Sequence, residues 1–296
     1  MKDHWLGGLA LGELAKKIWL EVYEGSILSR AAELAYYFLL ALFPMLIFLT
    51  SLIGFLPDAQ ENIFRALASV MPGEAMKLVH ETILDVVRNR SGGLISFGVL
   101  GALWAASGGV SAVMNALTVA YDVKEDRSFW KVRLIAVGLT VILASLIVVG
   151  VILIMFGDRF SVWLAAWLGL GAAFAVFWGV VDYLLGLALV FLGLQFIYYF
   201  GPNIKQGWRW ITHGAVFAVV SLVIASLLLS LYLRYGPSYS ATYGGLGAVI
   251  VLMLWLYLIG AAVILGGEVN ANIRRAADKA VDQNPSLRSK SQSIPV

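Results

Sequence analysis

Long stretches without a charged side chain constrain this chain more than any other feature of its sequence. They occur at residues 34–57, 91–121, 134–157, 160–181, 183–204, 210–233 and 235–267. Each is longer than the ~20 predominantly apolar residues that carry an α-helix across a bilayer. Only 13% of the residues are charged and 60% are hydrophobic, against roughly 25% charged in soluble domains. The sequence therefore predicts an all-α membrane protein with several transmembrane helices.

The same composition excludes several classes of protein. A transmembrane β-barrel needs ~10-residue segments of alternating polarity, whereas these apolar stretches are continuous. The net charge of +3 is too small to indicate a nucleic-acid partner, since basic loops already follow from membrane orientation. The chain has no cysteine, which excludes disulfides and thiolate chemistry.

The number of crossings is six or seven, because Asp182 alone separates residues 160–181 from 183–204. Cytoplasmic loops are enriched in Lys and Arg. Six crossings place 15 of the 21 basic residues on the side of the amino terminus, and seven crossings place only nine there. We therefore predict six helices, at about 34–57, 93–121, 134–157, 181–202, 211–233 and 246–268, with both termini in the cytoplasm.

These crossings divide the chain into three parts. Residues 1–29 form a cytoplasmic amphipathic segment, residues 30–272 the six-helix transmembrane domain, and residues 273–296 a polar cytoplasmic tail expected to be disordered. Residues 160–181 are left over. We expect the surplus segment, Ser161 to Trp178, to lie on the outer surface or to re-enter the membrane, since its tryptophans suit the bilayer interface.

Two amphipathic segments are expected at the membrane surfaces. In the first, Leu11, Leu14, Ile18 and Val22 recur at helical spacing. The charged side chains that point elsewhere are Glu13, Lys16, Lys17 and Glu24. This pattern is typical of an in-plane helix on the inner leaflet. The long first outer loop, residues 58–90, offers two short helices broken at Pro72. They form either a packed cap or a lid over a cavity.

Polar residues within a membrane helix mark the places where function is expected. Helix 93–121 carries such residues at spacings of three and four, in one stripe. The stripe consists of Trp104, Ser107, Ser111, Asn115, Thr118 and Asp122. It either lines a hydrated path or packs helices together, since Ser and Asn also hydrogen-bond across helix interfaces.

Charged groups and helix breakers complete the candidate set. Glu33 can pair with Arg30 on one face of its helix. Glu268 either pairs with Arg274 or Arg275 at the helix end, or is a proton-coupling or substrate-binding group. Candidate hinges are Pro44, Gly244 and Gly245. The three histidines form no metal motif, and neither a Walker A sequence nor a G-x-S-x-G motif occurs. We expect no metal, no cofactor and no enzymatic activity.

Several longer motifs recur together in one known family. They are Arg30-Ala-Ala-Glu-Leu-Ala-Tyr-Tyr-Phe-Leu-Leu-Ala-Leu-Phe-Pro44, Trp104-Ala-Ala-Ser-Gly-Gly-Val-Ser-Ala-Val-Met-Asn115, Arg127-Ser-Phe-Trp-Lys-Val-Arg133, Tyr198-Tyr-Phe-Gly-Pro-Asn203 and Tyr243-Gly-Gly-Leu-Gly-Ala-Val-Ile250. With these motifs the chain resembles the YihY/BrkB family of bacterial inner-membrane proteins, once labelled ribonuclease BN. The resemblance implies six helices, cytoplasmic termini and a place in the inner membrane. It implies little about activity, because the members are described mostly as virulence or envelope proteins.

Three functions follow as hypotheses. The first is a non-ATP-driven transporter or lipid-handling protein, with the polar stripe lining the path and membrane lipids and an unknown small molecule or lipid as partners. The second is a structural scaffold that acts through an envelope partner. The third, a membrane-bound ribonuclease, would depend on Asp122 or Glu125. No nucleic-acid partner is expected under the first two, and the oligomeric state is a monomer or a homodimer.

Overall fold

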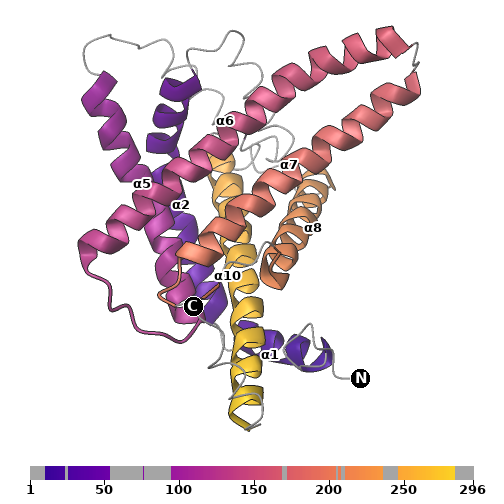
Figure 1. Ribbon diagram of the computed structural model, residues 1–296. Helices are drawn as coiled ribbons and strands as arrows, with labels where there is room; N and C mark the ends of the chain where they lie inside the picture. The colour runs from indigo at the N-terminus through magenta and orange to yellow at the C-terminus, as the bar shows by residue number, and fades with distance from the viewer. Residues whose placement is uncertain are drawn as a thin grey trace.

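All regular structure in the described part of the chain is α-helical (Figure 1). The computed structural model describes residues 11–23, 26–53, 76, 95–168, 172–204, 206–207, 211–235 and 246–283. The helices are α1 (Leu11–Tyr23), α2 (Ser26–Ile53), α5 (Ile95–Ala120), α6 (Phe129–Leu168), α7 (Ala172–Phe200), α8 (His213–Tyr235) and α10 (Leu246–Gln283). All except α1 contain a segment long and apolar enough to cross a membrane. These six candidate spans confirm the predicted all-α membrane fold.

The outward faces of the helices fit a bilayer. On α8, the exposed side chains include Val220, Leu227 and Leu231, whereas small residues such as Ala215 and Ala218 are buried. A soluble helix would carry polar groups on its exposed face. The chain is therefore a multi-pass membrane protein whose apolar outer surface lies against lipid.

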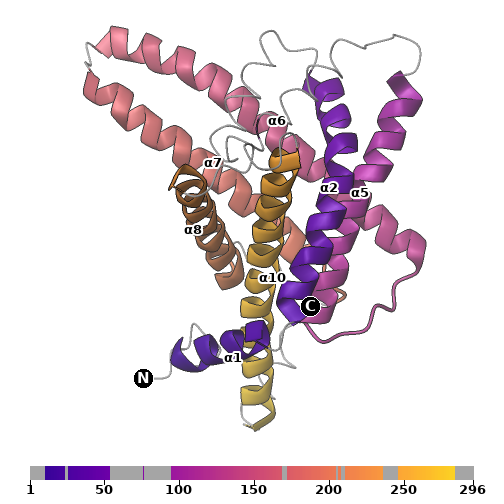
Figure 2. The same ribbon diagram turned by 180° about the vertical axis from the view of Figure 1, so that it is seen from behind.

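Helix α10 occupies the centre of the bundle. It packs against α1, α2, α5 and α8, and Figure 2 shows it between α8 and the α2–α5 pair. One buried apolar cluster lies around Leu252 and Trp255, and a second lies around Ile264, Leu117 and Tyr198. We call the end of the bundle near the second cluster, where α1 also lies, the inner end.

Helix α1 packs its apolar face on the protein itself. Leu14 is buried against Val269 and Ile273 of α10, with Ile18 beside them. The opposite side of α1 exposes Trp19 and Tyr23. Helix α1 and the last turns of α10 therefore lie at the same end of the molecule (Figure 1).

Four helices, α2, α6, α7 and α10, are longer than the predicted crossings. Helix α10 continues beyond Glu268 to Gln283, so residues 273–283, which we assigned to the tail, extend the last membrane helix. Helix α2 continues through Pro44 to Ile53, although proline supplies no N–H for the carbonyl of Leu40.

The surplus segment is the end of a helical hairpin. Residues 161–168 continue α6, and residues 172–178 begin α7. Helices α6 and α7 pack against each other along their length and extend obliquely beyond the other helices (Figures 1 and 2). The segment thus continues two of the membrane helices and does not form a separate surface helix. The charged pair Asp158–Arg159 does not interrupt α6.

Several predicted features lie outside the described residues. They include the first outer loop apart from Met76, the glycines Gly244 and Gly245, and residues 284–296 of the tail.

Candidate functional site

Polar side chains from five parts of the chain gather at the inner end of the bundle. We call this group the inner polar cluster. Its members are Glu21 on α1, Tyr121 after α5, Gln195 on α7, Thr212 before α8, and Glu268, Asn270, Asn272 and Arg275 on α10. Helix α10 supplies half of these residues because its last membrane turns meet α1, α5 and α8 together.

Glu268 is the buried carboxylate of the cluster, with 9% of its surface exposed. Nη2 of Arg275 lies 3.2 Å from Oε2 of Glu268 and 3.8 Å from Oε1 of Glu21. The same guanidinium donates a hydrogen bond to the carbonyl of Ala120. Arg275 therefore stands between two carboxylates from different helices and ties them to the end of α5.

Asn272 links α10 to α1 in this part of the cluster. Its Nδ2 donates to the backbone carbonyl of Glu268 at 3.0 Å and lies 3.4 Å from Oε1 of Glu21. Glu268 therefore lies beside a cation, Arg275, and a second carboxylate, Glu21.

A second branch of the cluster holds the start of α8. Asn270 accepts a hydrogen bond from the backbone N–H of Gly214 at 2.8 Å, and the hydroxyl of Thr212 accepts one from Ala215. These two bonds satisfy N–H groups that have no partner within the first turn of a helix. Thr212 also donates to Oε1 of Gln195 at 2.5 Å, which links α8 to α7.

Glycines allow α8 and α10 to cross closely beside this branch. A Cβ atom on Gly266 would lie 2.3 Å from Oη of Tyr198 and 2.5 Å from the carbonyl oxygen of Gly214. Tyr198 itself donates to the carbonyl of Val263 at 2.8 Å. Neither α8 nor Tyr198 could approach α10 in this way if Gly266 had a side chain.

Tyr121 connects the two branches at the end of α5. Burial raises the pKa of its phenol to about 12, against a smaller opposite effect of the nearby Arg274. Tyr121 therefore stays neutral at physiological pH and serves the cluster as a hydrogen-bonding group beside Asn270 and Glu268.

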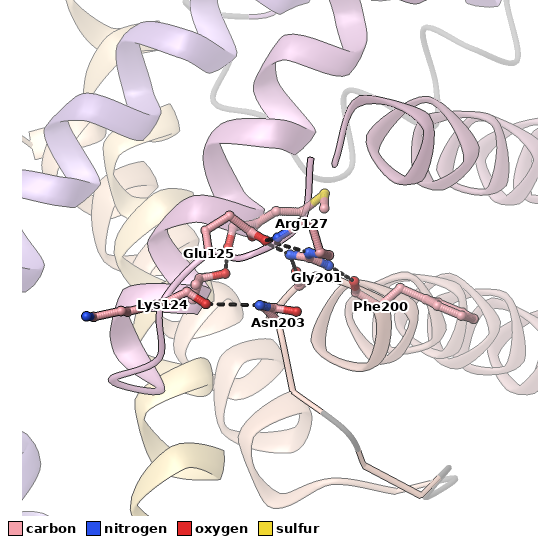
Figure 3. Close-up of polar contacts among 8 residues, drawn as sticks. Lys124, Glu125, Arg127, Phe200, Gly201 and Asn203 are labelled. Atoms are coloured by element: carbon pink, nitrogen blue, oxygen red, sulfur yellow. Dashed lines mark hydrogen bonds and ion pairs between the residues drawn. The ribbon is translucent and has the colours of Figure 1, made fainter. Parts of the chain in front are cut away.

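Next to the cluster, a second set of contacts joins two loops (Figure 3). Nη2 of Arg127 donates to the carbonyl of Gly201 at 2.8 Å and to Oε2 of Glu125 at 2.6 Å. Asn203 donates to the carbonyl of Lys124 at 2.9 Å. The Arg127 guanidinium holds the pKa of the Glu125 carboxyl below its usual range. We call this group the loop clasp; it fixes the end of α7 to the loop before α6.

The structure divides the predicted polar stripe of α5 between two environments. Ser107 and Thr118 are buried, and their hydroxyls donate to the carbonyls of Trp104 and Met114 on the same helix. Trp104, Asn115 and Asp122 are exposed, and Ser111 is half-buried. Most of the stripe therefore faces the outside of the bundle beside α6, and the path role predicted for it stays a prediction.

Asp122 has a local structural role. It is the non-glycine residue with a positive φ, 55°, in the described chain. Its N–H bonds to the carbonyl of Val119, and the N–H of Val123 bonds to that of Thr118. These two bonds form the Schellman motif that commonly ends an α-helix.

The remaining predicted residues fall in different places. Glu33 is exposed on α2, away from the inner polar cluster, and Pro44 is half-buried near the other end of the same helix. Glu268 lies at the centre of the cluster and pairs with Arg275, one of the two partners expected for it.

Sequence reasoning missed two important residues. Glu21 belongs to the cluster although it stands on an amphipathic helix; its spacing from Leu14 and Ile18 places it on their face, which was a usable signal. The sequence identifies Arg127 as a basic loop residue and as the first residue of a family motif, but nothing local in the sequence shows that it reaches Gly201. Within the residues that the structure covers, no three His, Asp or Glu side chains come together as a metal site.

The loop clasp unites two of the motifs on which the family resemblance rests, since Arg127 opens one and Asn203 closes the other. The sequence model of the family described as Virulence factor BrkB matches residues 18–291. The chain belongs to this family. The resemblance noted from the sequence is thereby confirmed.

Individual relatives in the BrkB family agree over most of the chain. The ribonuclease-like protein YfkH of Bacillus subtilis (strain 168) is 39% identical over 89% of this chain and 95% of its own length. A UPF0761 membrane protein of Chromohalobacter salexigens is 28% identical over 88% of this chain and 62% of its own length. Another from Alteromonas mediterranea is 27% identical, over 86% and 85%. No solved structure matches.

Proposed function

We propose that this BrkB-family protein is a non-ATP-driven transporter or lipid-handling protein of the bacterial inner membrane. The observation that carries the proposal is the buried carboxylate of Glu268, held by Arg275 beside a second carboxylate, Glu21. Ionisable groups in membrane helices are costly and commonly belong to substrate, ion or proton pathways.

The geometry of the pair supports a role beyond stability. A buried ion pair adds little stability relative to apolar side chains of the same size. Arg275 lies within ion-pair distance of both Glu268 and Glu21, and these residues belong to different helices. A change of partner would move α1 relative to α10, which gives the inner end two arrangements that a passing ion or substrate can bias.

The proposed orientation rests on charge. Six crossings with the amino terminus inside put most Lys and Arg residues on the cytoplasmic side. Helix α1 and the end of α10 lie together at one end of the bundle, so a single side of the membrane holds both. With this orientation the inner polar cluster faces the cytoplasm.

The test is a flux measurement with the purified full-length protein in liposomes. One probe is the proton, followed by an internal pH dye under an imposed gradient, and the other is a fluorescent phospholipid followed between leaflets. We expect faster movement of one probe than in empty liposomes, and loss of this movement in Glu268→Gln. The matched control is Asp278→Asn, which removes an exposed carboxylate of the same helix.

The flux of the two variants decides whether the proposal holds. Flux that is lost in Glu268→Gln and kept in Asp278→Asn supports it. Absence of flux for both probes in folded protein, or equal flux in the wild type and Glu268→Gln, contradicts it.

A scaffold is the second candidate, favoured by the hydroxyls of Ser107 and Thr118. Both are buried and donate to carbonyls of their own helix, so their polar groups are satisfied without a hydrated path. Under this alternative, crosslinking in cells recovers one stoichiometric envelope partner, and the liposomes show no flux.

A further inference from the structure

Arg133 is an arginine of the membrane-spanning segments that lies half-buried at the surface of the bundle. Arg133 lies in the second turn of α6, within the candidate span Phe129–Leu153. Its guanidinium carbon lies 4.2 Å from the ring centroid of Trp104 on α5, and Nη2 donates to the backbone carbonyl of Trp104. The side chain is thus held in place by stacking and by one hydrogen bond.

This guanidinium has no counter-charge from the described parts of the chain. The ion pairs found there involve Arg127, Arg274 and Arg275, and none involves Arg133. Nε of Arg133 is buried and has no hydrogen-bond partner among those residues. A cation in a membrane segment is expensive without an opposite charge, so an anion from outside the chain is expected here.

The surroundings of Arg133 are aromatic and exposed. Trp104 is 45% exposed and Trp130 is 71% exposed, with ring centroids 6.3 Å apart. Phe129 and Leu134, which flank them, are also exposed. Tryptophan is favoured where acyl chains meet headgroups, and Leu134 offers a surface for acyl chains.

The exposed side chains around Arg133 favour a lipid over a soluble anion. Helix α6 begins beside α5 and not at its inner end (Figures 1 and 2). A phospholipid can place its phosphate on the guanidinium while its acyl chains lie against exposed apolar residues such as Leu134. A soluble anion makes no contact with these apolar side chains.

The exposed face of α5 provides a polar approach to Arg133. Asn115 is exposed and Ser111 half-buried between Trp104 and the inner end. Both side chains offer hydrogen bonds to a headgroup. The part of the predicted stripe that faces outward thus leads from the inner end toward the guanidinium.

We propose that Arg133, with Trp104 and Trp130, binds the phosphate headgroup of an anionic phospholipid on the outer surface of the bundle between α5 and α6. Nη2 is used by the carbonyl of Trp104 and Nε is buried, so Nη1 is the nitrogen that donates to the phosphate oxygens. The site goes beyond the proposed function, because lipid binding here is independent of flux through the protein.

The test measures lipid retention by purified full-length protein in neutral detergent, using native mass spectrometry with phosphatidylglycerol and phosphatidylcholine in equal amounts. We expect the wild type to retain phosphatidylglycerol preferentially, and Arg133→Gln to lose about fivefold of that preference. The matched control is Lys131→Gln, which removes an equal charge from an exposed residue two positions away. Residues at that spacing do not share a helix face, so this control should keep the preference.

Two other outcomes overturn the proposal. One is a wild type that retains both lipids equally, a result that needs no variant and so does not depend on whether Arg133→Gln folds. The other is an equal loss in Arg133→Gln and Lys131→Gln, which indicates general attraction to positive charge. Either outcome leaves the flux experiment with Glu268→Gln unaffected.

Discussion

The inner polar cluster on α10 and the outward face of α5 and α6 differ in whether their arginine has an acidic partner. In the cluster, Arg275 is paired with Glu268 and Glu21. On the α5–α6 face, Arg133 stacks on Trp104 and bonds to a backbone carbonyl, with no acidic partner among the described residues. The charge of Arg275 is paired within the chain, so we expect a switch of ion-pair partners there. The charge of Arg133 has no partner among those residues and lies at the membrane-facing surface, so we expect a ligand there.

The largest expected effect tests whether the inner end is closely packed. Gly266→Ala should destabilise the protein by about 3 kcal/mol, because the new Cβ would meet Tyr198 and the carbonyl of Gly214. Thermal unfolding of the detergent-solubilised protein measures this. Gly186→Ala is the control, since nothing lies within 4 Å of its Cβ position. Equal stability of the two variants would show that α8 and α10 do not cross as described.

The next effect tests whether the charges of the inner polar cluster depend on one another. Arg275→Gln should cost about 2 kcal/mol, because it leaves Glu268 and Glu21 without their shared partner. Adding Glu268→Gln should restore part of this loss. Unfolding midpoints of the single and double variants provide the measurement. Additive effects would mean that the pair is not coupled.

A smaller effect separates the structural role of Asp122 from a role in a path. Asp122 adopts a left-handed conformation at the end of α5. Asp122→Val should destabilise by about 1 kcal/mol, and Asp122→Gly should not. Unfolding midpoints measure the difference in stability between the two variants. Liposome flux measures whether Asp122→Gly keeps its activity. If Asp122→Gly is stable but inactive, the carboxylate itself belongs to the path on the outward face.

The smallest effect concerns the loop clasp and its dependence on pH. Because Arg127 lowers the pKa of Glu125, the folded state holds that proton less tightly than the unfolded chain. The stabilisation is therefore present above the ordinary Glu value of about 4.3 and is lost as pH falls through the lower folded value. Glu125→Gln should cost about 0.5 kcal/mol at pH 7. In unfolding scans this difference should vanish in strongly acidic solution; a constant difference would exclude the ion pair as its cause.

Much of the fold follows from short-range features of the sequence. Charge-free runs locate the six spans, and the spacing of Leu14 and Ile18 identifies the buried face of α1. The pairing of Glu268 with Arg275 also follows from helical spacing, since they are seven residues apart on one helix. Each of these depends only on residues close together in the chain.

The rest depends on which neighbour covers a helix face. Periodicity places Ser107 and Asn115 in one stripe, but the packing of α5 buries the first and leaves the second exposed. The same limit applies to Arg133, which the sequence identifies as a basic residue near a helix start and as the last residue of a family motif. Its contact with Trp104 joins residues that are far apart in the chain, and no local pattern predicts it.

A structure of the full-length protein in nanodiscs that contain phosphatidylglycerol tests the contrast between the two regions most directly. We predict phosphate density on the guanidinium of Arg133 beside Trp104, with Arg275 held by Glu268 and Glu21 and free of lipid. Apolar density or an acidic side chain of the chain at Arg133, or a lipid phosphate on Arg275, would contradict the account.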